Sequence, residues 1–366
     1  MPTFTAQHRR LAALRLVAQG IGAEGPATPV QVVRRMLALQ AQDLPGVKWS
    51  VGLRQPPLTE TSVEAACDAG TIVRSWPMRG TLHLVAAEDL GWMLQLTTPG
   101  AIASLAARRA YLGIADLDAE RAREIAVATL AGGRVMARED LLAAIAAGGI
   151  GTGGQRGYHL LWYLAQTGTL VLGPTADRRQ MFALFDEWVP HPRRLTGEEA
   201  LGELTCRYFE SHGPATVPDL ARWSGLTMGA VRRGLASSGR RLAQLELAGQ
   251  TYYLAPATAA SERRASGVHL LPGFDEYVLG YQDRTAVLAR ESSQAVVPGG
   301  NGMFKSTIVA DGQVVGTWRK AIRAGEVVIA PQPFERLASS VRDGLAEAAL
   351  AYGAFLGRPA RIAWTA

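Results

Sequence analysis

Cysteine and long apolar runs are scarce in this chain of 366 residues, and each shortage excludes a class of protein. The two cysteines, Cys67 and Cys206, lie far apart with no partner at metal-ligand spacing, so neither a disulfide framework nor a zinc site is expected. No apolar run approaches the length of a membrane span, and residues 1–16 follow an amphipathic helical pattern rather than that of a signal peptide. We therefore expect a cytoplasmic protein with buried thiols and no membrane partner.

Several sequence signatures of catalysis are also missing. The chain has no Gly-x-x-x-x-Gly-Lys-Ser/Thr loop, no Gly-x-Ser-x-Gly turn and no His-Glu-x-x-His helix. The glycine-rich run at residues 148–154 does not follow a strand, which argues against a dinucleotide-binding loop. Carboxylates are plentiful, but no pair stands out as the two flanking acids of a glycosidase.

Lysine is rare, and arginine carries the positive charge. The chain has 35 arginines, 3 lysines and 32 acidic residues, which give a formal net charge of +6 and a pI of about 9.6. Arginine suits bidentate recognition of phosphates and bases, so the excess is a mild indication of a polyanionic partner. With 48% hydrophobic residues, the chain can bury a substantial core, and its length predicts two or more domains.

A short helix-opening segment recurs along the chain, at residues 25–30 and 213–220 and, more loosely, at 133–142. A second helix and alternating β-segments follow each copy. The expected wing strands are 71–76 and 80–85 in the first unit, 169–173 in the second, and 242–247 and 251–254 in the third. Helix, turn, helix and a two-stranded wing is the winged helix-turn-helix plan, which commonly reads DNA but also mediates protein contacts or simply packs. With a basic chain, DNA is the favoured partner.

From about residue 268 the pattern changes to short β-segments and turns. Asp311-Gly312 between alternating apolar residues predicts a two-residue hairpin turn, and a short apolar stretch at 295–297 precedes a glycine-rich loop. The fold class is therefore predicted to be mainly α with β (α+β), with tandem winged helix-turn-helix units and a C-terminal β-rich, barrel-like domain under a covering helix. The expected domains are residues 1–97, 98–195 and 196–260 for the three units and 261–366 for the C-terminal domain.

The most informative stretch is Gln40-Ala41-Gln42-Asp43. Thr28, with Pro29 and Gln31, predicts the start of a helix whose apolar stripe extends to Gln40, and Pro45-Gly46 predicts its end. Residues i and i+2 share a face only in extended chain, so the two amides can converge on one point beyond the last turn. Alternatively, they satisfy backbone groups at a helix end. For Asp43, turn hydrogen bonding and a catalytic role both remain open.

The motif resembles that of the bacterial winged-helix DNA glycosylases, the AlkZ group. Arg79-Gly80-Thr81-Leu82-His83-Leu84, the segment Leu271 to Tyr277, and Asp283-Arg284 resemble the family as well, so the likeness runs over nearly the full chain. One branch of the family has Gln-x-Asp at the active site and another has Gln-x-Gln. The second branch, which this chain resembles, implies excision of bulky N-alkylated purines and unhooking of interstrand crosslinks. In antibiotic-producing bacteria, it is associated with resistance to the producer's own DNA-alkylating product.

The resemblance implies that Gln40 and Gln42 are catalytic, with Asp43 beside them. Alkylation at N7 makes guanine cationic, so its glycosidic bond is weak and the base leaves without a strong acid. Two amides can then hold a nucleophilic water, and dipoles can stabilise an oxocarbenium-like sugar. The reaction is expected to be hydrolytic because no lysine adjoins the motif, Lys48 being the nearest. No metal or organic cofactor is implied.

Candidate DNA contacts lie after the motif and on the wings. Lys48 and Trp49 follow the motif, although Trp49 also suits the core. Arg79, Thr81 and His83 alternate along the expected wing and are predicted to project from one strand face. The remaining candidates are Arg156, Arg178 and Arg179 in the second unit, and Asn301 and Lys305 in a flexible loop expected between strands at 299–305. For all of these, a structural or solvated role is the alternative.

These observations predict a monofunctional DNA glycosylase that acts as a monomer on double-stranded DNA containing alkylated purines. The alternative is a non-catalytic winged-helix DNA-binding protein or transcriptional regulator, in which Gln-x-Gln only ends a helix. Regulators usually read two half-sites by symmetry. Three different units in one chain instead favour a monomer that clasps a lesion.

Overall fold

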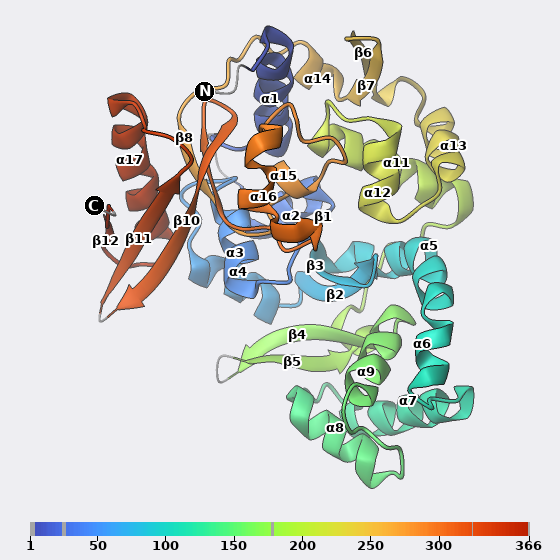
Figure 1. Cartoon of the computed structure of the whole chain (residues 1–366). Coiled ribbons are helices and arrows are strands. Elements are labelled where there is room, and N and C mark those ends of the chain that lie inside the picture. The colour runs from blue at the N-terminus through green and yellow to red at the C-terminus, as the bar shows by residue number, and fades with distance from the viewer. Residues whose placement is uncertain (1–3, 24–26, 177–178, 324, 365–366) are drawn as a thin grey trace.

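The structure is a computed structural model of the chain and describes residues 4–23, 27–176, 179–323 and 325–364. Within these ranges, helices combine with two five-stranded sheets and one two-stranded sheet. Figure 1 shows a central group of short helices and strands, flanked by an open sheet with its helix and by a helical unit, with a second helical unit below. The predicted α+β class is confirmed.

The first unit contains the predicted helices, but the glutamine motif has a different local structure. Its elements are α1 (Ala6–Gln19), α2 (Pro29–Met36), β1 (Ala38–Gln40), α3 (Leu44–Gly52), α4 (Glu60–Asp68), β2 (Ile72–Met78) and β3 (Thr81–Ala86). Thr28 and Gln31 form the predicted capping box of α2. The helix stops before Leu37, whose φ is 65°, and the chain turns into β1. The prediction that Pro45-Gly46 ends this helix is wrong, because both residues lie in the first turn of α3, where proline favours a helix start.

The hairpin of β2 and β3 turns at Arg79 and Gly80. Their φ angles are 53° and 69°, and the flanking residues Met78 and Thr81 are paired. Two positive φ values are typical of a type I′ hairpin turn, which glycine accommodates without strain. Arg79 therefore lies in the turn, and the prediction that it shares a strand face with Thr81 and His83 is wrong.

The second unit shares a sheet with the first. Its elements are α5 (Ala87–Ser104), α6 (Ala106–Tyr111), α7 (Asp116–Leu130), α8 (Arg138–Ala147), α9 (Arg156–Gln166), β4 (Leu170–Ala176), β5 (Arg179–Leu184) and α10 (Phe185–Trp188). The two hairpins join in the order β1-β3-β2-β4-β5, with Arg74 paired to Leu172. Helix α5 runs across residue 97, where the first domain boundary is predicted, so the division into separate domains stays a proposal.

The third unit has the helix, helix and wing order that the sequence predicts. It comprises α11 (Gly197–His212), α12 (Val217–Ser224), α13 (Met228–Ser238), a 3-10 turn (Gly239–Arg241), β6 (Ala243–Leu247), β7 (Gln250–Leu254) and α14 (Pro256–Ala259). Thr216 caps α12 with Asp219 in a capping box. The preceding residue, Ala215, bridges to Tyr253 of the wing, so the wing is tied to the start of α12.

The C-terminal domain is an open sheet rather than a closed barrel. It contains β8 (Val268–Leu271), α15 (Glu276–Leu279), α16 (Ser293–Val296), β9 (Thr307–Ala310), β10 (Gln313–Arg323), β11 (Glu326–Pro333), α17 (Ser339–Phe355), β12 (Ala360–Ile362) and 3-10 turns at Arg290–Ser292 and Pro298–Gly300. The strand order is β12-β11-β10-β9-β8, and α17 covers the sheet. The predicted hairpin turn at Asp311-Gly312 is confirmed by φ values of 48° and 80°.

The long β10–β11 hairpin, rather than loop 299–305, is the β-hairpin that projects from this domain (Figure 1). Residues 295–297, read as a β-segment in the sequence, belong to α16 and its end, so the loop does not join two strands. At the far end of β10, Ile322 is 54% exposed and is flanked by the exposed Arg323.

Candidate active site

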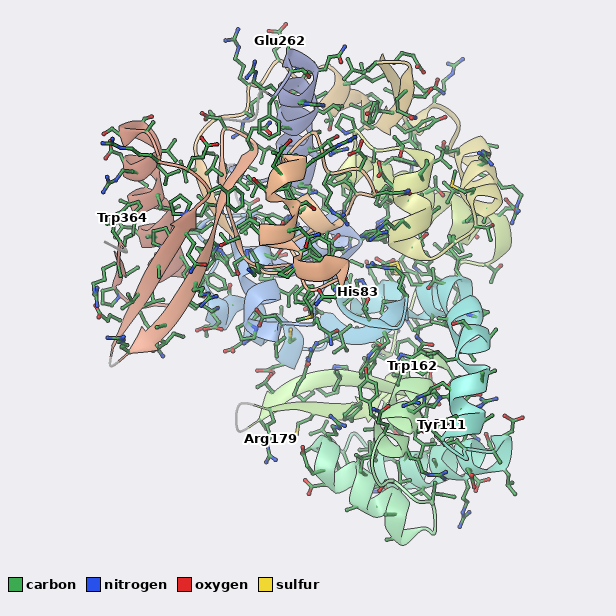
Figure 2. The ribbon with its side chains drawn as sticks, in the orientation of Figure 1. His83, Tyr111, Trp162, Arg179, Glu262 and Trp364 are labelled. Carbon is green, nitrogen blue, oxygen red and sulfur yellow. The ribbon has the colours of Figure 1, made fainter. Side chains whose placement is uncertain are left out.

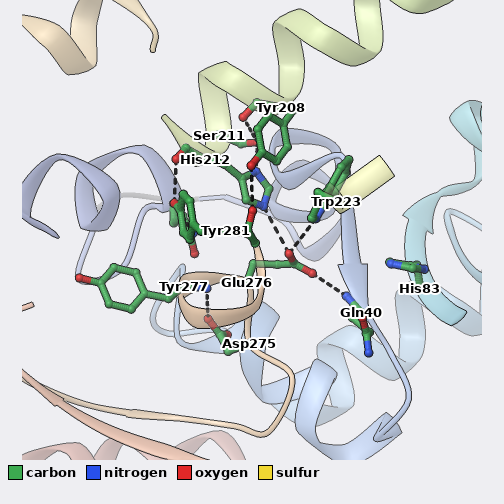
Figure 3. Close-up of polar contacts among 12 residues, drawn as sticks. Gln40, His83, Tyr208, Ser211, His212, Trp223, Asp275, Glu276, Tyr277 and Tyr281 are labelled. Carbon is green, nitrogen blue, oxygen red and sulfur yellow. Dashed lines mark hydrogen bonds and ion pairs between the residues drawn. The ribbon is translucent and has the colours of Figure 1, made fainter. Parts of the chain in front are cut away.

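Gln40 ends β1, an edge strand of the shared sheet. It pairs with His83 of β3, and the N–H of Ala41 donates to the Leu82 carbonyl at 2.7 Å. The Gln40 N–H instead points away from β3 and donates to Oε1 of Glu276 at 2.9 Å (Figure 3). The Gln40–His83 pair is thus of the non-hydrogen-bonded kind, in which opposite side chains come closest.

Glu276 is a completely buried carboxylate at the start of α15. Besides Gln40, it accepts hydrogen bonds at Oε2 from Nε1 of Trp223, at 2.9 Å, and from Nε2 of His212, at 3.4 Å (Figure 3). Burial alone would raise the pKa of Glu276, but the bonds from His212 and from the Gln40 N–H outweigh burial and lower that pKa. Glu276 is therefore ionised at neutral pH and fixes the backbone of Gln40.

The residue beside Glu276 anchors α15 through a second buried contact. Asp275 caps α15 by accepting from the Tyr277 N–H and receives both terminal nitrogens of Arg54, at 2.8 and 2.9 Å. Arg54 has no exposed surface, and its Nη2 also donates to the Gln19 side chain of α1. The pair thus ties the segment that follows α3 to α1 and to the start of α15.

Arg79 reaches back from the hairpin turn to the side chain of Gln40. Its Nη2 lies 3.2 Å from Oε1 of Gln40 and 3.4 Å from Nε2 of His83. Burial lowers the pKa of Arg79; Glu276 opposes the shift and Arg222 adds to it. Since the ordinary pKa of arginine is far above neutrality, the guanidinium remains charged.

His83 is buried and neutral. Its Nδ1 donates to the Thr81 carbonyl at 2.9 Å, so its Nε2 is left as an acceptor for Arg79. Burial and the nearby Arg79 charge lower the pKa of His83 to about 3. At neutral pH His83 consequently holds no proton that it could give to a leaving base.

Gln42 and Asp43 lie in the exposed bend between β1 and α3. Gln40, by contrast, is only 7% exposed, so the two glutamines occupy different environments. Asp43 stands at the N-cap position of α3, yet its side chain makes no capping hydrogen bond. The Ala41 carbonyl between the glutamines accepts from Nε of Arg74 at 2.9 Å, which fixes the bend to β2.

Two of the predicted DNA contacts, Lys48 and Trp49, make contacts within the fold. Nζ of Lys48 forms ion pairs with Glu64 and, at 3.5 Å, with Glu60, both on α4. Trp49 is buried, and its Nε1 donates to the Leu270 carbonyl at 2.6 Å. Both side chains therefore link α3 to its neighbours.

The other predicted contacts lie at several places on the molecule, and Figure 2 labels two of the predicted residues, His83 and Arg179. Arg156 holds the backbone carbonyls of Leu112, Gly113 and Gly151, and the Thr81 hydroxyl donates to the Met78 carbonyl. Arg179 is exposed and 3.6 Å from Glu139. Asn301 and Lys305 are exposed, and Asn301 accepts from the Met303 N–H. Arg178 lies outside the described residues.

Two arginines near the site were not singled out as contacts from the sequence. Arg222, exposed in the last turn of α12, lowers the pKa of both Arg79 and Arg284. Arg284 follows α15; burial, with Arg222, lowers its pKa to about 10, and its guanidinium lies 4.9 Å from the Phe304 ring centroid. Arg222 is thus close enough to repel both Arg79 and Arg284, and this concentration of positive charge favours an anionic partner there.

The residues around Gln40 thus come from the first winged-helix unit, the third unit and the C-terminal domain. The fold and the place of the glutamine motif in it are those expected of a winged-helix DNA glycosylase. A family model described as DNA glycosylase AlkZ-like matches residues 33–355, and the chain belongs to the AlkZ-like DNA glycosylase family. It is an enzyme that hydrolyses N-glycosyl bonds, as predicted, rather than the non-catalytic regulator of the alternative.

Two comparisons with Streptomyces sahachiroi agree with the family. The chain is 27% identical over 347 residues to an interstrand DNA cross-link repair glycosylase of that organism. The aligned region covers 90% of this chain and 91% of that protein. The solved structure of the Streptomyces sahachiroi DNA glycosylase AlkZ superposes with a TM-score of 0.81, at 25% identity, over 99% of this chain and 100% of that one.

In the described residues, no helix is long and apolar enough to cross a membrane.

Proposed function

We propose that this enzyme is a monofunctional glycosylase that hydrolyses the N-glycosidic bond of N7-alkylated purines in double-stranded DNA. The observation that carries the proposal is the protonation state of the site. Gln40 and Gln42 are neutral amides, and the pKa of His83 is about 3. None of the three can protonate a base at neutral pH. A purine that N7 alkylation has already made cationic does not need that proton.

The proposed reaction forms one bond and breaks one. The oxygen of a water molecule bonds to C1′ as the C1′–N9 bond breaks, and the electron pair of that bond goes to the purine and neutralises it. One proton of the water is released to solvent. The ionised Glu276 behind Gln40 and the amide dipoles favour the positive charge that develops on the sugar. Asp43 is exposed, and its side chain makes no capping hydrogen bond to α3, so it stays a candidate for orienting the water.

Bulky adducts and interstrand crosslinks are the substrates we propose within this class. The support is the similarity to the Streptomyces sahachiroi protein, whose name describes interstrand cross-link repair. By extension, we propose a role in self-resistance of a producer of a DNA-alkylating compound. The enzyme is proposed to act as a cytoplasmic monomer, with Arg222 and Arg284 facing the phosphates near the lesion and the β10–β11 tip contacting a groove.

A panel of matched duplexes tests this substrate class. Each duplex carries, at one position, guanine, N7-methylguanine, a bulky N7-alkylguanine, or a nitrogen-mustard crosslink between N7 atoms. We expect base release from all three alkylated duplexes and none from the unmodified one, with crosslinked strands separating on a denaturing gel. Release of unmodified purine at a comparable rate would contradict the role of the cationic base. Release of the monoadducts without crosslink unhooking would restrict the function to single adducts.

A further inference from the structure

Gln40 is held by two independent contacts, one on its backbone and one on its side chain. The buried carboxylate of Glu276 accepts its N–H, at 2.9 Å. The guanidinium of Arg79, with Nη2 at 3.2 Å, donates to its side-chain Oε1. Fixing both ends leaves the amide little rotational freedom.

The Arg79 contact also determines which way the amide faces. A guanidinium has donors and no acceptor, so only the carbonyl oxygen of Gln40 can face it. His83 cannot offer an alternative, because its Nδ1–H is bonded to Thr81 and its Nε2 faces the same Arg79 nitrogen. Rotating the amide by half a turn would place its NH2 group against a cation. The Nε2 of Gln40 accordingly points away from Arg79, and it donates to none of the residues that the structure describes.

We propose that Arg79 is a positioning residue that makes Gln40 a hydrogen-bond donor to the substrate, while Gln42 supplies the acceptor for the nucleophilic water. This inference rests on the proposed hydrolysis of N7-alkylated purines. As the C1′–N9 bond breaks, its electron pair enters the purine, whose ring nitrogens become stronger acceptors for the Nε2–H of Gln40. The exposed Gln42 carbonyl accepts one hydrogen of the water, which orients the water oxygen toward C1′. The two glutamines thus perform different tasks.

The same substitution at the two glutamines tests this division. Gln40→Glu keeps an acceptor for Arg79 but removes the NH2 donor, whereas Gln42→Glu keeps an acceptor for water. We expect the saturated single-turnover rate on an N7-methylguanine duplex to fall about 100-fold in Gln40→Glu, as for loss of a transition-state donor. The rate of Gln42→Glu should fall by a smaller factor than that of Gln40→Glu, because its acceptor remains. Equal losses, or a larger loss in Gln42→Glu, would overturn the inference. A wild-type enzyme that releases no base would instead overturn the proposed function.

Arg79→Met gives a second readout that does not depend on the glutamine variants. If Arg79 acts through Gln40, the saturated single-turnover rate falls about tenfold, the loss expected for an amide free to rotate away from its charged partner, while the dissociation constant for DNA stays within about twofold. If Arg79 only contacts a phosphate, the dissociation constant rises and the saturated rate is unchanged, which would refute the positioning role. Arg121→Met, which removes an exposed arginine paired with Glu124 on α7, is the matched control and should change neither quantity.

Discussion

Replacing Glu276 with glutamine removes a buried charge on which three donors from different parts of the chain converge. The Gln40 N–H comes from β1, and the side chains of His212 and Trp223 come from α11 and α12. Glutamine has nearly the same shape but only one acceptor oxygen, and its NH2 group must face one of these donors. At least one donor is then left without a partner.

The expected loss of stability follows from these contacts. Leaving one buried donor unsatisfied costs about 1–3 kcal/mol, and each remaining bond changes from charge-assisted to neutral. Removing the buried charge returns part of its desolvation cost, which acts in the opposite direction. We therefore expect the free energy of unfolding to fall by about 2–3 kcal/mol at neutral pH.

The pH dependence gives this prediction its sharpest test. Because the folded state lowers the pKa of Glu276 below its usual value of 4.5, the stabilisation by the charge is fully present above that value and is lost as the pH falls through the folded pKa. Urea unfolding at several pH values should show a constant gap between wild type and Glu276→Gln at pH 5–7 that narrows at lower pH. The control is Glu198→Gln, because Glu198 is exposed and pairs with Arg233 at the surface. This variant should change the free energy of unfolding by less than about 0.5 kcal/mol. A gap that persists unchanged at low pH would show that the Glu276 charge is not what stabilises the folded state.

Three further predictions concern other residues. Asp275→Asn leaves the fully buried Arg54 without its carboxylate and should lower the free energy of unfolding by about 3–5 kcal/mol, measured by urea unfolding. The double variant Asp275→Asn/Arg54→Met removes the unpaired charge and should be more stable than Asp275→Asn alone. Equal stability of the two variants would show that the broken pair is not the cause of the loss. Lys48→Met should leave the dissociation constant for DNA within about twofold of wild type, measured by fluorescence anisotropy, because Glu60 and Glu64 already hold the amine. A larger rise in the dissociation constant would indicate that Lys48 contacts DNA. Burial raises the pKa of Cys67 to about 12 and that of Cys206 above its usual value, so a thiol reagent at pH 8 should label neither until the protein is unfolded with denaturant, and labelling of the native enzyme would contradict this.

Local signals in the sequence were enough to predict much of the fold. The capping box at Thr28, the Asp311-Gly312 turn and the strands of the third wing depend on residues close in sequence, and the structure contains them. The end of α2 was mispredicted because the same dipeptide, Pro45-Gly46, can end one helix or begin another. Which of the two occurs depends on the pairing of β1 with β3, a contact across more than forty residues.

The environment of the glutamines could not be predicted in the same way. Gln40 N–H and Glu276 are 236 positions apart, and the other donors to that carboxylate lie on helices of a third unit. Glu276 stands in the segment Leu271 to Tyr277, yet nothing local indicates that its carboxylate is buried behind the motif. Likewise, the sequence left open whether Trp49 contacts DNA or packs in the core, and its packing against Tyr352 and Phe355 places it in the core.

Glutamine-dependent hydrolysis without a covalent intermediate can be measured on a single substrate. A duplex with a single N7-methylguanine is incubated with wild type, Gln40→Ala/Gln42→Ala or no enzyme, in the presence of a chelator. Free base is quantified by mass spectrometry, and parallel samples are treated with borohydride. Wild type should release intact N7-methylguanine, the double variant should match the enzyme-free rate, and no protein–DNA adduct should be trapped. Release that survives loss of both glutamines, or a trapped adduct, would contradict this mechanism.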